Sequence, residues 1–276
     1  MLTISIDPVA FTIGSLPVRW YGIMAAIAVA LMIAITPRIA KGLGVTRDLY
    51  SLFLWCILGG YIGGRTAYII YDWGHFVANP REIINFEGLA QNGMIIGVVV
   101  AALIYMRVTR MRFSTLLSIG DAVAVGMPLA LAIGRIGCTI NGCCTGTPAP
   151  DLPWAIVYTH PNSIAPLNVA MHPTQIYHLL WSLIVFAVVW RLRGKFKPEG
   201  SLVFFCFCLF AAGDLGIRFL RTDDPVLWGL RQAQVLDIAI LAVFLPWLII
   251  RIRKFKETGL VTELANEAAQ EQSQGD

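Results

Sequence analysis

Long apolar runs alternate with short polar segments along most of the chain. Seven of these runs approach the ~20 residues that an α-helix needs to span the hydrocarbon of a bilayer. They predict helices at residues 20–37, 50–71, 92–106, 114–136, 173–191, 200–217 and 234–251. The third run is the shortest, and we expect each boundary to be accurate to about four residues. The pattern predicts an all-α polytopic membrane protein with about seven transmembrane helices.

Lysine and arginine residues divide the connections into two kinds. Fourteen of the 21 lie in every second connection or just after the last run. These are Arg38, Lys41 and Arg47; Arg107, Arg110 and Arg112; Arg191, Arg193, Lys195 and Lys197; and Arg251, Arg253, Lys254 and Lys256. Segment 137–171 contains neither residue type. The positive-inside rule places the basic connections in the cytoplasm. This predicts an outside N-terminus and a cytoplasmic C-terminus, and an even number of spans would break the alternation.

Composition supports the same class of protein. Hydrophobic residues make up 57% of the 276 residues and charged residues 14%, whereas soluble domains carry about 25% charged residues. Because the runs are evenly spread, we expect one transmembrane domain at residues 1–256. The polar tail at residues 257–276 has Glu263, Glu267 and Glu271 at four-residue spacing. We expect this tail to be a frayed helix or disordered.

Seven arginines do not follow the charge rule, because they lie on the predicted outer side or in the outer half of a run. They are Arg19, Arg65, Arg81, Arg135, Arg218, Arg221 and Arg231. A charge at membrane depth costs about 2.5–3.5 kcal/mol on insertion scales, and such residues are usually functional. Snorkelling to the interface is enough to explain Arg19 and Arg81. It is a weaker explanation for Arg65 and Arg135, which lie among glycine and apolar residues.

Two of these arginines adjoin glycines. Glycines in the segment 59–64 are four residues apart, which allows close contact between helices. The adjacent Arg65 needs an anion or a carboxylate partner, such as Asp72 or Asp121. Arg135 lies between Gly134 and Gly137, where a ligand can approach the backbone. Arginine binds phosphate through paired hydrogen bonds that lysine cannot reproduce. The alternative for Arg135 is a buried ion pair with aspartate that only joins helices.

Two further groups of polar residues flank the later runs. Asp214 and Arg218 are four residues apart and therefore share one helix face, with Arg221 about one turn further on. They are either part of a site or an internal ion pair. His172 precedes Pro173, a residue well tolerated in a first helical turn. His172 would then cap that helix or meet a ligand.

Three of the six cysteines are clustered at Cys138, Cys143 and Cys144. Their C-x4-C-C spacing lacks the paired C-x2-C pattern typical of zinc sites, so we expect no metal. A disulfide between Cys138 and one of the other two is the alternative, because the predicted topology places them on the oxidising side.

Taken together, these segments resemble the prolipoprotein diacylglyceryl transferases of bacteria. The matching pieces are Arg19–Gly22, Gly63–Tyr68, Gly93–Gly97, Asp121, Gly134–Gly137, Ile140–Gly142, His172–Tyr177, Phe219–Arg221 and Gln234. They occur in the family's order over roughly residues 8–250, and the ordered set is more specific than any single piece.

The resemblance implies an enzyme that moves diacylglycerol from phosphatidylglycerol to the lipobox cysteine of a prolipoprotein. A thioether forms and glycerol phosphate leaves. It implies a bacterial inner-membrane location with the site facing the outer side, no cofactor and no nucleic-acid partner. The residues expected to bind phosphatidylglycerol are Arg135, Arg65, Asn141, Gly142, His172, Gln175 and Arg221. The residues expected to act in catalysis are Arg135, Arg218, Asp214, Tyr21 and Asn92.

Several polar positions depart from the family pattern. Asn92 occupies the place of a histidine often assigned to catalysis, and asparagine cannot take a proton near neutral pH. The order of Asp214 and Arg218 is reversed, and His178 replaces an acidic residue. Cysteines replace the family's asparagine at Cys138 and its glutamate at Cys143. Asp214, Tyr21 or His172 would then serve as base, or the substrate thiol would ionise without one. The alternative function is a related protein that binds anionic lipid but catalyses a different transfer, or none.

Overall fold

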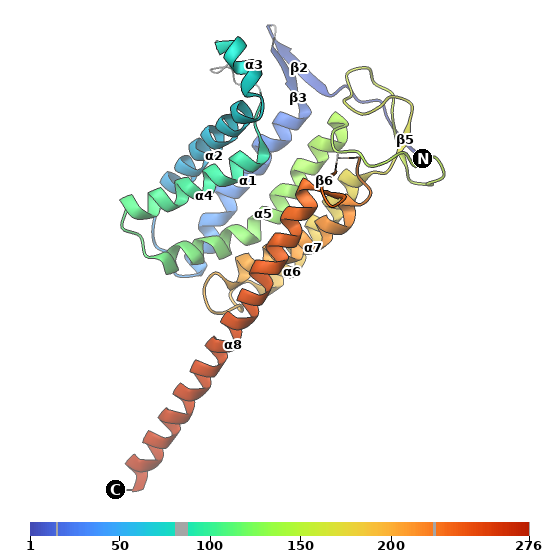
Figure 1. Cartoon of the computed structure of the whole chain (residues 1–276). Helices are drawn as coiled ribbons and strands as arrows, with labels where there is room; N and C mark the ends of the chain where they lie inside the picture. Colours follow the sequence, from blue (N-terminus) through green and yellow to red (C-terminus); the bar gives the residue numbers. More distant parts are fainter. Residues whose placement is uncertain (15, 81–87, 223–224, 276) are drawn as a thin grey trace. The chain divides into compact units, whose positions relative to one another are not determined.

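A computed structural model describes residues 1–14, 16–80, 88–222 and 225–275 (Figure 1). Arg81, one of the arginines singled out above, lies outside these ranges. The helices are α1 Trp20–Gly42, α2 Tyr50–Tyr71, α3 Trp73–Ala78, α4 Gln91–Val108, α5 Phe113–Asn141, α6 Thr174–Leu192, α7 Ser201–Arg218 and α8 Gln232–Gly275. Each of the seven predicted runs corresponds to one of these helices, and only the short α3 was not expected.

Short strands occur in the connections, where the sequence predicted none. They are β1 Leu2–Ile4, β2 Val9–Ile13, β3 Leu16–Arg19, β4 Ile156–Tyr158, β5 Ala170–Met171, β6 Pro225–Leu227 and β7 Leu230–Arg231. One sheet has the order β1-β4-β5, with β1 parallel to β4 and β4 antiparallel to β5. The other two sheets are the antiparallel pairs β2-β3 and β6-β7. The first sheet ties the N-terminus to the connection between α5 and α6.

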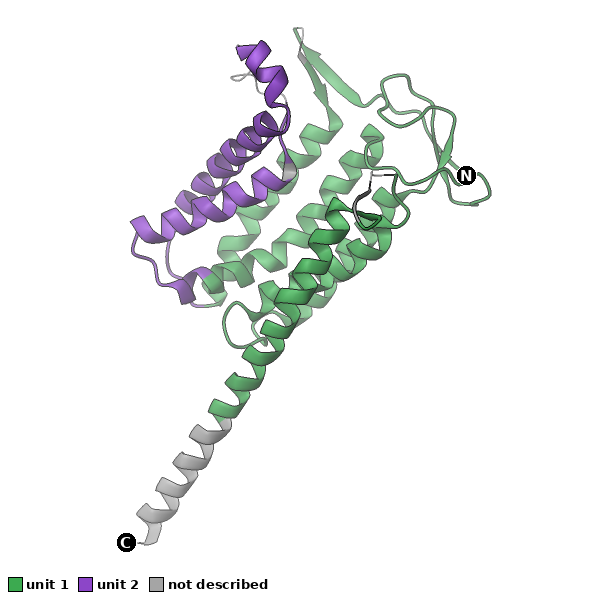
Figure 2. Cartoon of the chain, viewed as in Figure 1, with its two compact units in different colours: residues 1–43, 117–276 green, residues 44–116 purple. Residues whose placement is uncertain are grey.

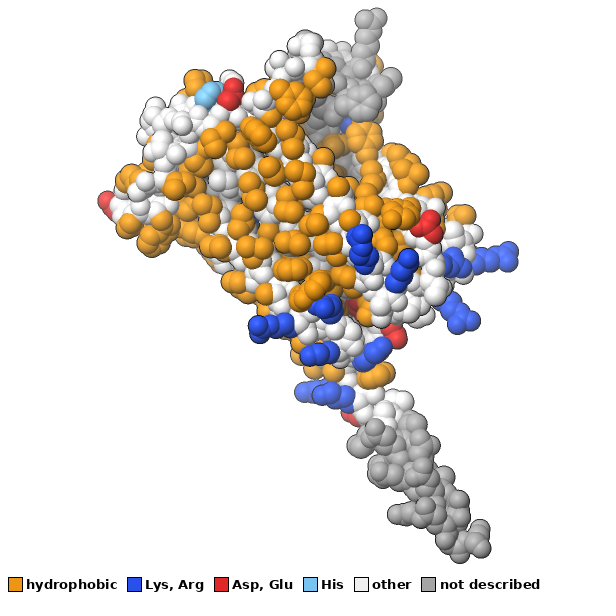
Figure 3. Space-filling view, turned by 180° about the vertical axis from the view of Figure 1, so that it is seen from behind, with side chains coloured by type: hydrophobic (Ala, Val, Ile, Leu, Met, Phe, Trp, Pro, Cys, Tyr) orange, Lys and Arg blue, Asp and Glu red, His pale blue; other side chains and the backbone are white. Residues whose placement is uncertain are grey.

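The protein is a helical, multi-pass membrane protein. Within the described ranges, six helices are long and apolar enough to cross a membrane, namely α1, α2, α5, α6, α7 and α8. The apolar part of α4, Asn92–Val108, is shorter, as the sequence indicated, so the count of seven spans stays a prediction. Large hydrophobic side chains such as Ile62, Ile184 and Val243 are exposed, and hydrophobic side chains cover much of the face in Figure 3. Such a surface suits contact with lipid.

Three helices run further than predicted. α1 continues through Pro37 to Gly42, because membrane helices tolerate proline where nearby groups satisfy the freed backbone. α5 extends five residues beyond its predicted end and includes Cys138 and Asn141. α8 continues beyond its predicted end at residue 251 to Gly275, and the fraying or disorder expected of the tail stays a prediction.

The chain divides into two compact units, residues 1–43 with 117–276 and residues 44–116 (Figure 2). The smaller unit is held together by close packing of α2 against α4. A Cβ added at Gly63 would come within 2.8 Å of Gly97 Cα, and one at Gly97 would collide with the carbonyl oxygen of Gly59. The close helix contact predicted from the glycine spacing is therefore confirmed. The expectation of one domain over residues 1–256 stays a prediction.

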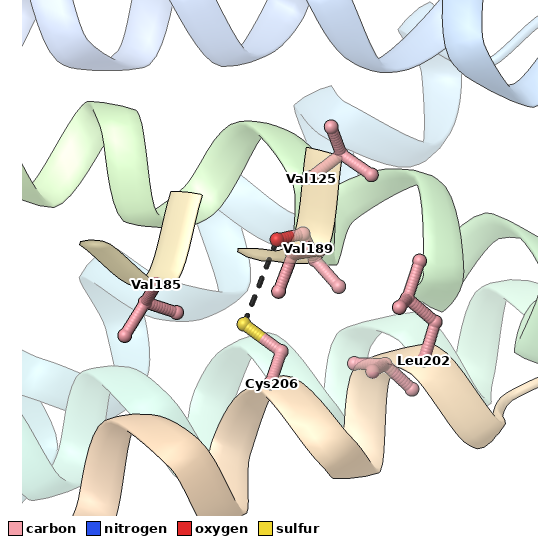
Figure 4. Packing of buried hydrophobic residues seen from close by; sticks show 7 residues of the cluster. Val125, Val185, Val189, Leu202 and Cys206 are labelled. Atoms are coloured by element: carbon pink, nitrogen blue, oxygen red, sulfur yellow. Dashed lines mark hydrogen bonds between the residues drawn. The ribbon is translucent and has the colours of Figure 1, made fainter. Parts of the chain in front are cut away.

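The larger unit has its own apolar core between α5, α6 and α7. Val125, Val185, Val189, Leu202 and Cys206 are buried there, and the Cys206 thiol donates to the Ala124 carbonyl oxygen at 3.6 Å (Figure 4). This packing aligns the three helices whose ends carry the polar residues of the candidate site.

Asp121 fastens the start of α7 within the same unit. Its Oδ2 accepts from the Gly200 N–H at 2.7 Å and its Oδ1 from the Val203 N–H at 2.9 Å. Both carboxylate oxygens therefore cap a helix N-terminus, where a negative charge is stabilising. This role differs from the partnership with Arg65 suggested by the sequence.

Candidate active site

Gly142 ends α5 and determines where the following cysteines lie. It has φ of +76°, a conformation that glycine adopts without a steric penalty. Its N–H donates to the Cys138 carbonyl oxygen at 3.0 Å, the pattern of a left-handed helix cap. A side chain at this position would also collide with Ser163 and Ala165. The chain can therefore turn back beside the last turn of α5.

The start of α6 holds the turn in place. The Thr174 hydroxyl donates to the Cys144 carbonyl oxygen at 2.6 Å, and the Gln175 side-chain amide donates to the Cys143 carbonyl oxygen at 2.8 Å. Thr174 and Gln175 are both fully buried. Cys144 itself has φ of +62°, which is uncommon for a residue with a side chain. Gln175, predicted to bind lipid, thus uses its amide to position this turn.

The turn brings three thiols together. The Sγ atoms of Cys138, Cys143 and Cys144 all lie within 4.8 Å of one another. All six cysteines of the chain are free thiols, so the disulfide considered from the sequence is not present in this structure. Hydrogen bonds from the other two thiols, together with the charges of Arg221 and Arg135, hold the pKa of Cys144 well below its ordinary value. The cluster therefore lies in a locally positive environment.

Arg135 lies six residues before the end of α5 and is half-buried. Its carbonyl oxygen accepts from the Thr139 hydroxyl at 2.8 Å. Among the residues that the structure describes, no aspartate or glutamate pairs with its guanidinium. The buried aspartate pair considered from the sequence is therefore absent from this part of the chain, and the guanidinium can accept an anionic ligand.

The start of α1 lies beside the same end of α5. Arg19 donates to the side-chain oxygen of Asn141 at 3.1 Å, so it has a specific partner where snorkelling was the expected explanation. A Cβ added at Gly137 would lie 3.1 Å from the Tyr21 Cα. Tyr21 is 47% exposed. The structure thus groups Tyr21, Asn141 and the cysteine turn around the end of α5.

A second polar group lies between α6, α7 and α8. Asp214 accepts from Arg218 Nε at 2.5 Å, and its other oxygen lies 3.0 Å from His178 Nδ1. Asp237 on α8 lies 3.8 Å from the same Arg218 nitrogen. His178, Asp214 and Asp237 are buried. The internal ion pair considered from the sequence is confirmed, and it belongs to a four-residue network that the sequence did not reveal.

Arg221 follows α7 and lies close to the cysteine turn. It forms an antiparallel bridge with Gly146, and the Thr147 N–H donates to the neighbouring Leu220 carbonyl oxygen at 2.7 Å. Arg231 holds this segment from the other side by donating to the carbonyl oxygens of Arg218 and Arg221. The fold therefore brings the positive charge of Arg221 to the same turn as that of Arg135.

His172 joins the turn through its backbone. Its N–H donates to Thr147 and its carbonyl oxygen accepts from Gly146, each at 3.0 Å. No side-chain hydrogen bond caps α6, so the capping role suggested for His172 is wrong. Its Nδ1 is buried and has no hydrogen-bond partner among the described residues. The imidazole therefore keeps a nitrogen with which to meet a ligand.

Arg65 and Asn92 belong to the smaller unit. Arg65 is buried and donates to the Gly88 carbonyl oxygen at 3.2 Å. Its guanidinium also lies 5.6 Å and 5.2 Å from the ring centres of Tyr68 and Phe76, which is within cation–π range. Asn92 lies in the first turn of α4. These contacts with Gly88, Tyr68 and Phe76, all inside the smaller unit, stabilise the buried charge of Arg65.

Three buried residues of the site were not predicted from the sequence. His178 was noted only as a departure from the family, and Thr174 and Asp237 were not singled out. An acidic residue in an apolar run is itself a signal, and it would have identified Asp237. Nothing local marks Thr174, because its contact with the Cys144 carbonyl spans thirty residues of sequence.

Comparison with known proteins confirms the resemblance over most of the chain. A family model described as prolipoprotein diacylglyceryl transferase matches residues 8–250. A phosphatidylglycerol–prolipoprotein diacylglyceryl transferase of Dehalococcoides mccartyi is 38% identical over 93% of this chain and 98% of its own length. Enzymes of that name from Clostridioides difficile and Bordetella bronchiseptica are 35% and 36% identical, each over 84% of this chain and 90% of its own length.

Proposed function

Because the chain belongs to the prolipoprotein diacylglyceryl transferase family, we propose that it transfers diacylglyceryl from phosphatidylglycerol to a prolipoprotein cysteine. The acceptor is the lipobox cysteine of the signal peptide, and the product is a thioether. The relatives carry both substrates in their names and align with nearly the whole chain. That alignment is the observation that carries the proposal.

Arg135 binds the lipid phosphate in this mechanism. A guanidinium with no carboxylate partner among the described residues is available for the paired hydrogen bonds that phosphate accepts. As the carbon–oxygen bond breaks, negative charge grows on the phosphate, and a positioned cation stabilises that charge most in the transition state. Arg221, whose charge reaches the same turn, assists from the end of α7.

The remaining site residues position these groups. Asn141 and Gly142 shape the end of α5, and Gln175 holds the Cys143 carbonyl oxygen. His172 offers its buried Nδ1 to the headgroup. Arg218 and Asp214 stabilise α7, which Arg221 follows, and Tyr21 lines the site beside Gly137. The roles expected for Arg65 in lipid binding and for Asn92 in catalysis stay predictions. The acyl chains stay in the bilayer while the headgroup enters the protein.

The membrane in question is the bacterial inner membrane, with the site on its outer side. The segment that carries the cysteine turn and His172 follows α5 and includes the stretch without lysine or arginine, as expected of a translocated connection. Prolipoproteins reach the enzyme as exported precursors, so their cysteine is presented on that side. Residues 1–256 form the catalytic domain.

A transfer assay with purified protein tests the proposal. Phosphatidylglycerol and a lipobox peptide should give a peptide whose mass has increased by one diacylglyceryl group. A peptide with serine in place of cysteine should stay unmodified, and phosphatidylethanolamine should be a poor donor. An unmodified cysteine peptide, under conditions in which the Dehalococcoides relative modifies it, would contradict the proposal. Lipid binding without transfer would then favour a non-catalytic lipid-binding protein.

A further inference from the structure

We propose that Cys138, Cys143 and Cys144 form a zinc site whose open fourth position takes the thiol of the acceptor peptide. This inference rests on the proposed function for the identity of the thiol, but the metal site stands on the geometry of the cluster. It revises the expectation from the sequence that these cysteines bind no metal. The C-x4-C-C spacing does not show that the chain turns at Gly142 and brings Cys143 and Cys144 back beside the end of α5.

The sulfur positions suit a single ion. Tetrahedral zinc with Zn–S bonds of about 2.3 Å separates its sulfur ligands by about 3.8 Å. The three Sγ atoms already lie within 4.8 Å of one another, so small rotations of the side chains bring them onto one ion. Within the described residues this is the only group of three or more histidine, cysteine or acidic ligand atoms so close together.

The surroundings hold the ligands without closing the site. Buried Thr174 and Gln175 fix the carbonyl oxygens of Cys144 and Cys143, and such outer contacts orient metal ligands. Cys138 is buried, whereas Cys143 and Cys144 are partly exposed. Structural zinc sites have four protein ligands, whereas catalytic sites have three and keep one position open. Three thiols and an accessible side match the second kind.

Nearby cations compensate the charge of such a site. Zinc bound by three thiolates carries a net charge of −1, and a fourth thiolate makes it −2. Arg221 pairs through its backbone with Gly146, two residues beyond Cys144. Arg135 precedes Cys138 by three residues in α5, and residues three apart are neighbours on a helix surface. The arginine proposed to bind the lipid phosphate is therefore close to the position proposed for the acceptor thiol, as an attack on the adjacent carbon requires.

The zinc would activate the thiol as follows. The acceptor thiol loses its proton to solvent on binding the metal, because a coordinated thiol is deprotonated. The bound sulfur attacks the glycerol carbon that carries the phosphate, so a sulfur–carbon bond forms and the carbon–oxygen bond breaks. The leaving glycerol phosphate keeps the bonding electrons and gains one negative charge. The neutral thioether then leaves the metal.

This arrangement supplies what the other polar residues lack. Asn92 cannot accept a proton, and Asp214 is already bound by Arg218 and His178. Coordination removes the need for a separate base at the thiol.

The experiment uses the full-length protein, purified without chelator under reducing conditions. Elemental analysis should find about one zinc per chain in the wild type and in the control Cys56→Ser. The variants Cys138→Ser and Cys144→Ser should lose that zinc. Cobalt-loaded wild type reports the fourth position directly: a lipobox peptide with cysteine should shift the visible cobalt bands, and the serine peptide should not. Zinc removal should lower the transfer rate about 10²-fold or more, the range of proton-transfer catalysis, and added zinc should restore it.

Three results overturn the inference. The first is a protein that binds neither zinc nor cobalt. A disulfide within the cluster, detected as thiols that resist alkylation unless a reductant is added, counts as the same result because oxidised cysteines cannot bind the metal. The second is a cobalt spectrum that the cysteine peptide does not change. The third is full transfer by metal-free protein, which would leave the proposed function intact. Conversely, zinc binding and a cobalt shift without any transfer would support the site and contradict the proposed function.

Discussion

The imidazole of His178 and the carboxylate of Asp214 form a buried contact between α6 and α7, with Nδ1 3.0 Å from Oδ1. The resemblance described from the sequence implies that both residues depart from the family pattern, His178 by replacing an acid and Asp214 by reversing the charge order with Arg218. The structure makes them partners. The two departures would then compensate each other. A basic residue on α6 faces an acid on α7 here, whereas the family pattern implies an acid on α6 and a basic residue on α7, and both arrangements attract.

The charge swap Asp214→Arg with Arg218→Asp should destabilise the protein although it keeps the charges in one helix. The new guanidinium would face His178, and the new carboxylate would face Asp237. Breaking a buried ion pair costs about 3–5 kcal/mol, and thermal unfolding in detergent should show a loss of that size. Adding His178→Glu should recover part of it. The swap Lys197→Glu with Glu199→Lys, at an exposed pair, should cost less than about 1 kcal/mol.

Transfer by the three-site variant separates structure from catalysis. If Asp214 only pairs, the folded variant with His178→Glu should retain substantial activity. Loss of transfer in a folded variant would support a catalytic role for Asp214 or Arg218, and Asn92→His would be the rescue to attempt. Wild-type stability of the two-site swap would contradict the network as described.

Arg135→Ala should lower kcat/KM by roughly 10²–10³, or about 2.7–4 kcal/mol, by analogy with loss of an oxyanion-hole donor. Arg135→Lys should lose nearly as much, because an ammonium group cannot replace the planar fork of hydrogen bonds. Steady-state transfer to the lipobox peptide measures both. The exposed Arg253→Ala is the matched control and should have wild-type activity. A wild-type rate for Arg135→Ala would place the phosphate elsewhere.

Cys144 should react with alkylating agents at lower pH than an ordinary thiol. Its pKa is depressed by hydrogen bonds from Cys138 and Cys143 and by the charges of Arg221 and Arg135. A lowered pKa means that the reactive thiolate persists as the pH falls below about 8.5, where free cysteine becomes protonated. Mass spectrometry of chelator-treated protein after brief alkylation at pH values from about 6 to 9 measures the profile. Arg221→Ala should move it towards higher pH, and an unchanged profile would argue against the role of these charges.

The distribution of hydrophobic residues was enough to predict the helices. Each apolar run became a helix, because burial in lipid forces the backbone to satisfy its own hydrogen bonds. The pairing of Asp214 with Arg218 also followed from spacing, since residues four apart share a helix face. Both features depend on local sequence alone.

The rest depends on contacts between distant segments. The thiol cluster needs the φ of Gly142 and the hydrogen bonds from Thr174 and Gln175, none of which a spacing rule includes. The partner of Asp214 on α6 and that of Arg218 on α8 could not be assigned without the packing of those helices. The strands are only two to five residues long, too short to show an alternating pattern.

Gly63→Ala should destabilise the smaller unit. An added Cβ would overlap the carbonyl oxygen of Gly93 on α4, and overpacking of this kind costs about 1–3 kcal/mol. Limited proteolysis and thermal unfolding should both detect the change. Gly74→Ala in the same unit meets nothing within 4 Å and is the control. Equal stability of the two variants would contradict the close packing of α2 on α4.

The orientation of the chain determines whether the cysteine turn can meet an exported peptide. Reporter fusions after Lys41, Lys195 and Lys256 should report the cytoplasm, because each follows or lies within a cluster of basic residues. Fusions at Asn79 and Pro150 should report the outside, since an odd number of spans separates them from those clusters. Pro150 is the decisive position, because it follows the thiol cluster directly and precedes His172. A cytoplasmic signal there would remove the seven-span topology and would place the proposed acceptor site on the side from which prolipoproteins have already departed.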